Sequence, residues 1–219
     1  MAMDGTSGAG VDAIERLPLV CFSHLRWNSV FQRPQQLLSR FATRREVFFF
    51  EEPIQSGEDD LRVETCPSTG VQVLTPLLRD PHDIEALRRV VDTLMARLGT
   101  ASAWYYTPLA REFSDHVPWQ ATAYDCMDEL SAFRFAATDM KAREQRLIAD
   151  ADVVFTGGLG LFEARRDQHA NIHCFPSGVD IKHFAAATER LAEPEDQAHL
   201  PRPLLGYFGV IDERLDLAL

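Results

Sequence analysis

The feature that most constrains the fold is a regular alternation between short apolar runs and stretches with helical spacing. The runs have the length and composition of strands buried on both faces. They are Leu19–Ser23, Val47–Phe50, Val71–Leu74, Ala103–Tyr106, Ala121–Tyr124, Val153–Thr156 and Ile172–Phe175. Strands and helices that alternate in this way predict an α/β fold with a doubly wound, mostly parallel, Rossmann-like sheet of about seven strands. Ligands of such folds bind at the carboxyl ends of the strands.

The stretches between the apolar runs carry helix signals. Pro34 precedes Gln35–Arg45, where apolar residues recur at helical spacing. The stretch Asp80–Asp83 combines an N-cap residue, a proline and an acidic residue, and it predicts the start of a helix. Gly99 is expected to end this helix.

The last predicted strand is followed by a turn and a change in composition. Pro176 ends that strand, Gly178 is expected to adopt a positive φ in a tight turn, and Asp180 is expected to cap a short helix. The predicted domains are a disordered tail over 1–17, a Rossmann-like domain over 18–184, a polar linker over 185–203 and the first strand of a truncated second domain over 204–219.

Composition excludes some classes of function. The 219 residues carry a net charge of −11, which argues against a nucleic-acid partner. The four cysteines form no C-x-x-C pair and the histidines show no ligand spacing, so neither a metal site nor a redox motif is expected. No apolar run is long enough to span a membrane and no signal peptide is evident, so a cytoplasmic location is expected.

The loop after the first strand is the first candidate site, for an acceptor or a phosphate. It leads into a helix N-terminus, which attracts anions. Its candidate ligand-binding residues are His24, Arg26, Trp27, Asn28, Gln32 and Arg33. The alternative is that Trp27 and Phe31 pack against the core while the arginines face solvent.

The second candidate site follows the fifth predicted strand. Asp125 is the candidate catalytic base, with Asp128 and Glu129 beside it, because neighbouring carboxylates raise one another's pKa. The alternative is that Asp125 caps a helix and the other two are solvated. Three further residues that follow strands, Thr107, Gly157 and Gly158, are expected to line the same cleft, although the glycines fit a tight turn equally well.

Several segments resemble the group 1 (GT4-like) glycosyltransferases of the GT-B fold. The turn at Pro176–Phe184 matches the pattern P-x-G-V-D-x-x-x-F, and Trp27–Leu37 matches the opening W-x-x-V-x-Q-R-P of a subfamily from bacterial polysaccharide gene sets. Three more segments are similar in order, and they are Tyr124–Leu130 with Phe133, Ala151–Thr156, and Gly206–Gly209 with Asp212–Arg214.

This resemblance implies the acceptor-binding, amino-terminal domain of an enzyme that moves a sugar from a nucleotide sugar to a glycan or lipid-linked acceptor. It implies chemistry of the retaining kind, no essential metal and no tightly bound cofactor. The donor would be held mainly by a second domain, so this chain alone is expected to be inactive, and Gly178 and Asp180 would shape the crossing between domains. Many relatives have a histidine where this chain reads Tyr124-Asp125-Cys126, which leaves the donor contact unassigned.

Two other functions stay open. One is a non-catalytic α/β module that binds a phosphorylated ligand or a protein partner, and the other is a GT-B-fold sugar epimerase. The basic side formed by Arg40, Arg44 and Arg45 suggests a weak contact with an anionic membrane surface, with a solvated face as the alternative. The apolar stretch 204–210 suggests a dimer contact if it remains unpaired.

Overall fold

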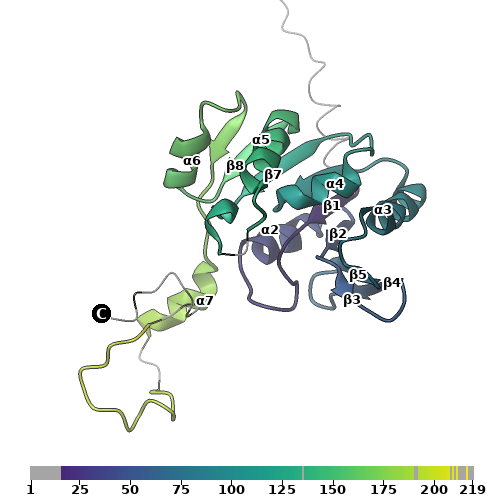
Figure 1. The fold of residues 1–219 in the computed structure, drawn as a ribbon. Coiled ribbons are helices and arrows are strands. Elements are labelled where there is room, and N and C mark those ends of the chain that lie inside the picture. Colours follow the sequence, from purple (N-terminus) through teal and green to yellow (C-terminus); the bar gives the residue numbers. More distant parts are fainter. Residues whose placement is uncertain are drawn as a thin grey trace, which may run out of the picture. The chain divides into compact units, whose positions relative to one another are not determined.

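The structure is a computed structural model that describes residues 16–134, 136–189, 192–207, 209, 211 and 216. The chain divides into two compact units, Met1–Gly178 and Val179–Leu219 (Figure 1). The expected disordered tail, residues 1–17, lies outside the described residues except at its last two positions. Among the described helices, none has both the length and the apolar character needed to cross a membrane.

The first unit is built on a mostly parallel, nine-stranded sheet in the order β3-β5-β2-β1-β6-β7-β8-β9, with β4 antiparallel to β5. The strands are β1 Leu19–Phe22, β2 Val47–Phe50, β3 Ile54–Gln55, β4 Asp60–Thr65, β5 Gln72–Leu78, β6 Ser102–Tyr105, β7 Thr122–Cys126, β8 Val153–Thr156 and β9 Ile172–Cys174. The predicted doubly wound α/β fold is therefore confirmed.

The helices alternate with these strands along the chain. They are α2 Arg33–Phe41, α3 Ile84–Leu98, α4 Arg111–Ser114, α5 Met140–Asp150 and α6 Leu159–Arg165, with short 3-10 turns η1 Pro108–Ala110 and η2 Leu130–Ala132. The central strand β1 pairs with both β2 and β6. The chain moves outward from β1 through β2 and β5, then returns to β6 on the other side. The carboxyl ends of β1 and β6 thus form the switch point where open α/β sheets bind ligands.

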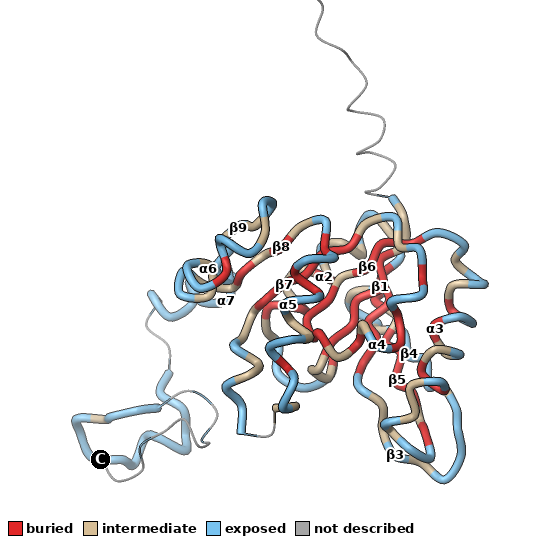
Figure 2. Tube along the Cα trace, turned by 45° about the horizontal axis from the view of Figure 1, so that its top comes forward, coloured by how far each residue is buried: buried red, intermediate tan, exposed pale blue. Residues whose placement is uncertain are grey.

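Alternate residues of the strands fill two separate cores on the two faces of the sheet. Phe22, Phe50 and Tyr105 belong to the core that packs against α3, α4 and α5. Cys21 and Phe49 face the opposite core, to which α2 contributes Leu38. Figure 2 shows that burial is concentrated in the central strands of this unit.

Three local expectations were wrong or incomplete. The fifth predicted strand was expected to end at Tyr124, but β7 continues through Asp125 and Cys126. The helix expected to begin at Asp80 begins at Ile84, where Asp83 is the N-cap and its side chain accepts a hydrogen bond from the Ala86 N–H at 2.9 Å. The two-residue β3 was not predicted, because so short a strand is defined by its pairing with β5.

The turn after β9 is only partly as expected. Gly178 does not have a positive φ, since the glycines with positive φ among the described residues are Gly70, Gly99 and Gly209. A β-carbon at Gly178 would meet nothing within 4 Å, so neither sterics nor φ requires glycine there.

The second unit begins with a short helix. Asp180 is the N-cap of α7, Ile181–Ala185, and its side chain accepts a hydrogen bond from the His183 N–H at 3.2 Å. The turn η3, Ala186–Thr188, follows. The expected strand over 204–211 includes two residues outside the described part, and its described residues form no strand. The domain boundaries, including the truncated second domain, remain predictions.

Candidate functional site

The loop after β1 is held in place by the carboxylate of Glu51, which follows β2 and is buried. One oxygen accepts a hydrogen bond from the Trp27 backbone N–H at 2.7 Å, and the other accepts from Arg26 at 3.1 Å and from Thr75 at 2.9 Å. The Arg26 guanidinium also donates to the Glu52 carbonyl at 2.6 Å. These internal hydrogen bonds hold the loop in its shape.

Trp27 packs inward, as one of the two interpretations of this loop expected. Its ring lies edge-on to Phe49 at a centroid distance of 5.1 Å, and its carbonyl accepts a hydrogen bond from the Gln35 side chain at 2.9 Å. The Gln35 amide oxygen in turn accepts from the Gln32 N–H at 3.1 Å, at the start of α2. Phe31 is exposed, so it does not pack as that interpretation also expected.

Arg33 and Asp125 form a buried ion pair between the first turn of α2 and strand β7. The Arg33 Nε lies 3.0 and 2.9 Å from the two carboxylate oxygens, and Nη2 lies 2.9 Å from Oδ1. Arg33 Nη1 also donates to the Phe175 carbonyl at 2.6 Å. Burial raises the pKa of Asp125, and hydrogen bonds and charge from Arg33 oppose that shift.

This pairing bears on the expected roles of both residues. The Asp125 carboxylate is enclosed and oriented by Arg33, so it is placed to hold α2 and β7 together. Its catalytic role stays a prediction that the enclosed position disfavours. Arg26 and Arg33 are both engaged with carboxylates of the chain itself, and the adjacent Asn28 is exposed. Arg33 would have to break its buried ion pair to bind a phosphate.

His24 and Asp128 lie near the switch point. Burial lowers the pKa of His24, although the charge of Asp128 and a hydrogen bond with the Tyr106 backbone oppose that shift. The Nδ1 atom of His24 is buried without a hydrogen-bond partner among the described residues. The charge of Asp128 thus acts on His24, although the sequence places the two residues in separate candidate sites.

Glu129 belongs to a different network, on the α5 side of the sheet. Arg165 donates to Glu129 at 2.7 Å and to Glu144 at 2.9 Å, and the Tyr124 hydroxyl donates to Glu144 at 2.7 Å. Burial opposes ionisation of Glu129, but hydrogen bonds from Ser131 and Arg165 outweigh it and lower its pKa. Glu129 is therefore tied to α6.

The two glycines after β8 have separate roles. A β-carbon at Gly157 would lie 3.1 Å from the Met127 Cα, so glycine allows the two backbones to approach closely. A β-carbon at Gly158 would meet nothing within 4 Å, and this residue precedes α6 as its N-cap. Glycine is thus required by close packing at the first position and not at the second.

A cavity of about 460 Å³ lies at the carboxyl ends of β1 and β2 and beside the residues that follow β6. This volume is within the range of small-molecule sites, which are roughly 300–1,000 Å³. Its walls are mainly apolar and include Phe22, Phe50, Leu87, Leu109 and Phe113, whereas Gly157 and Gly158 do not line it. Every wall residue belongs to the first unit, and the cavity lies at the edge of the sheet where a ligand was expected.

Polar and charged side chains form the smaller part of the walls of this cavity. Ser23 and Thr107 contribute hydroxyl groups, and Thr107 is one of the expected cleft residues. Each hydroxyl oxygen accepts a backbone hydrogen bond, from Leu25 at 3.0 Å and from Leu109 at 3.3 Å, so each O–H can still donate to a ligand. The charged or titratable lining residues are Glu51, Glu52, His82, Glu112 and Arg143.

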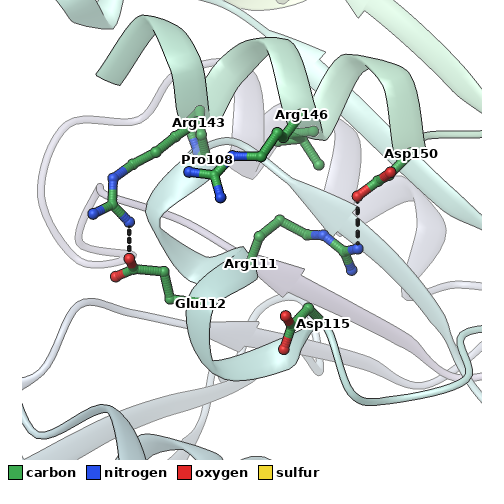
Figure 3. A pocket seen from close by; sticks show the side chains of 8 residues that line it. Pro108, Arg111, Glu112, Asp115, Arg143, Arg146 and Asp150 are labelled. Atoms are coloured by element: carbon green, nitrogen blue, oxygen red, sulfur yellow. Dashed lines mark hydrogen bonds and ion pairs between the residues drawn. The ribbon is translucent and has the colours of Figure 1, made fainter. Parts of the chain in front are cut away.

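A smaller groove of about 160 Å³ lies between α4 and α5 and is lined by both acidic and basic side chains. Arg111 pairs with Asp150 at 3.1 Å, and Arg143 pairs with Glu112 (Figure 3). Arg143 and Glu112 also line the larger cavity, so this ion pair is shared by both.

Sequence reasoning missed most of the larger cavity. Glu52, His82, Phe113 and Arg143 come from segments far apart in the sequence, and no spacing between them marks a motif. One signal was present, since the paired acids Glu51-Glu52 directly follow a predicted strand. Within the described residues, no cluster of three or more histidine, cysteine or acidic side chains could hold a metal ion.

No family model and no curated protein matches the sequence. Solved structures do match. A sucrose-phosphate synthase from Thermosynechococcus elongatus matches with a TM-score of 0.56 at 16% identity. The match covers 81% of this chain and 53% of the synthase chain. An E. coli trehalose-6-phosphate structure bound with UDP-2-fluoro glucose also scores 0.56, at 12% identity, over 83% of this chain and 53% of that one. A trehalose-6-phosphate synthase, OtsA, scores 0.52 at 13% identity over 83% and 53%.

The chain thus spans about half the length of the structures that it matches. At these identities the likeness concerns the fold. The chain has the Rossmann-like α/β fold found in these GT-B synthases.

Proposed function

We propose that this chain is the acceptor-binding domain of a glycosyltransferase. The enzyme would move a sugar from a nucleotide sugar to a glycan or lipid-linked acceptor in the synthesis of a cell-surface polysaccharide. The supporting observation is that a cavity of ligand size lies at the carboxyl edge of a sheet with the fold of glycosyl-transferring synthases. The sequence motifs that resemble group 1 enzymes support the same proposal.

The proposed chemistry divides the work between two domains. This chain would hold the acceptor in the cavity, and a second domain would hold most of the donor and stabilise the leaving diphosphate, as the resemblance implies. The chain alone would then be inactive, and no metal or tightly bound cofactor would be required. Retention of the anomeric configuration and a cytoplasmic, weakly membrane-associated location belong to the same proposal.

A sugar epimerase is a second candidate, and one observation favours it. Glu52 and His82 line the same cavity, and a carboxylate and an imidazole are groups that can remove and return a proton. A module for phosphorylated ligands gains no such support, because Arg26 and Arg33 are engaged internally.

The test is a donor screen on the complete product of the gene and on this 219-residue chain. A nucleotide sugar that binds the native state raises its melting temperature. With that donor and an acceptor extract, the complete product should release nucleoside diphosphate and extend the acceptor by one sugar in a mass spectrum, and this chain should do neither. Turnover by the chain alone would contradict its proposed inactivity. An altered donor sugar without diphosphate release would favour the epimerase, and no turnover of any donor would contradict both.

A further inference from the structure

The walls of the 460 Å³ cavity restrict the chemistry of its ligand. Three phenylalanines, from β1, β2 and α4, line it together with aliphatic side chains from α3 and η1. Such walls favour an apolar group, because each Å² of apolar surface removed from water contributes roughly 25 cal/mol.

The cationic group in the cavity is already neutralised. Arg143 pairs with Glu112, which also lines the cavity, and its Nε lies 2.8 Å from the Asp139 carboxylate. Figure 3 shows the Arg143 guanidinium directed at Glu112. A ligand phosphate would have to compete with two carboxylates for this arginine.

Two carboxylates lie at the helix terminus that borders the cavity. Ile84 and Leu87, in the first turn of α3, line the cavity. The Asp83 carboxylate accepts the Ala86 N–H, and the Asp80 carboxylate accepts the His82 N–H at 2.9 Å. These carboxylates place negative charge at the N-terminus of α3, which disfavours the binding of an anion there.

One carboxylate at the cavity remains available. Both oxygens of Glu51 are engaged, whereas the Glu52 side chain accepts no hydrogen bond from the residues that the structure describes. Burial raises the pKa of Glu52, although the charge of Arg26 opposes that shift. A carboxylate repels anions, and it accepts a hydrogen bond from a hydroxyl group.

We propose that this cavity binds the uncharged, apolar end of the acceptor and that Glu52 accepts a hydrogen bond from one of its hydroxyl groups. The identification of the ligand as an acceptor rests on the proposed function. The binding of an apolar glycoside in the cavity does not depend on it. The preferred ligand is an aryl or alkyl glycoside, and a sugar phosphate binds poorly.

The test is equilibrium binding to the full chain by calorimetry or ligand-observed NMR, without a donor. Phenyl β-D-glucoside should bind at least tenfold more tightly than D-glucose or glucose 6-phosphate, and its affinity should change less than twofold between 50 and 300 mM salt, since no ion pair forms.

Two variants localise the binding. Ala137 lines the cavity and is half-buried. Ala137→Trp should fill the space and weaken phenyl glucoside binding at least tenfold, whereas Ala142→Trp, at an exposed position of α5, should change it less than twofold. Glu52→Ala should weaken it about tenfold or more, in line with the loss of one hydrogen bond to a charged group.

Three results would overturn the inference, and one further result would refute only the proposed function. Tighter binding of glucose 6-phosphate, undetectable binding of the phenyl glucoside at 10 mM, or full affinity in a folded Ala137→Trp variant would each overturn the inference. A chain that binds the glucoside as described while the complete gene product transfers no sugar would retain the binding site and refute only the proposed transferase.

Discussion

Asp125 fits two roles, a catalytic base and a structural partner of Arg33, and the sequence alone does not distinguish them. Asp125 looked like a catalytic base because it follows an apolar run and precedes two other acids. Its actual partner is Arg33, which is far away in sequence, and the ion pair is enclosed between α2 and β7. A local pattern cannot show such a partner, because nothing in the spacing of nearby residues encodes it.

Loss of either member of this pair should destabilise the fold. Arg33→Ala leaves the Asp125 charge buried and unpaired, so we expect a loss of about 3–5 kcal/mol in the free energy of unfolding. Urea denaturation followed by circular dichroism measures this change.

Two controls accompany that measurement. Arg44→Ala, at an exposed position, should change the free energy of unfolding by less than about 0.5 kcal/mol. Replacing both Arg33 and Asp125 by leucine should cost less than the single change, since no charge is left unpaired. A cost below about 1 kcal/mol for Arg33→Ala would show that the pair is not what holds α2 to β7.

Cys66 differs from the other cysteines. Burial opposes its ionisation, but hydrogen bonds from Ser68, Thr69 and Trp27 outweigh burial and lower its pKa to about 6. Burial raises the pKa of Cys126 to about 12 and that of Cys21 well above its usual value.

We therefore expect Cys66 to react with iodoacetamide before Cys21 and Cys126. Because the thiolate is the nucleophile, its alkylation rate should rise with pH through a midpoint at about 6 and level off above it. Peptide mass spectrometry of a Cys174→Ser variant gives the rate at each pH, and Ser68→Ala should move the midpoint upward. A midpoint of about 8.5, the value of a free thiol, would contradict the hydrogen-bonded thiolate.

At the scale of elements, the sequence predicts the apolar strands well and the boundaries less well. β1, β2 and β8 are continuous apolar runs, and the structure has them where the pattern predicts them. β7 extends past its apolar run because Arg33 compensates the buried Asp125 charge. The cavity was not predictable in detail, because five segments supply its walls and their proximity depends on the sheet order.

The start of α3 offers a direct test of a boundary. Asp83→Ala should lower the free energy of unfolding by about 1 kcal/mol, since the Ala86 N–H loses its acceptor. Asp80→Ala should cost less, because Asp80 accepts from His82 in the turn before the helix. Thermal or urea denaturation of the two variants compares them, and a larger cost for Asp80→Ala would move the effective helix start back to the position that the sequence suggested.

At the scale of the whole molecule, the two units differ in how they are built. The first unit contains both hydrophobic cores that the structure describes. The described side chains of the second unit are mostly exposed, including Leu205 at 99% and Tyr207 at 60%. Exposed apolar side chains in one stretch favour association with another surface.

This contrast bears on self-association. A variant that ends at Pro203 lacks the apolar stretch 204–210, so it should sediment with a smaller weight-average mass than the full chain at the same concentration. Circular dichroism should show that its helix and strand content is retained. Equal sedimentation of the two proteins over a tenfold range of concentration would rule out a dimer contact through this stretch.

The central position of β1 also has a consequence during synthesis. Leu19 pairs with Val47 on one side but with Ser102 on the other, so one edge of this fully apolar strand lacks its neighbour until β6 has left the ribosome. At roughly 5–20 residues per second, that interval lasts several seconds. During that interval the nascent chain exposes an unpaired apolar strand edge, which can pair with another chain.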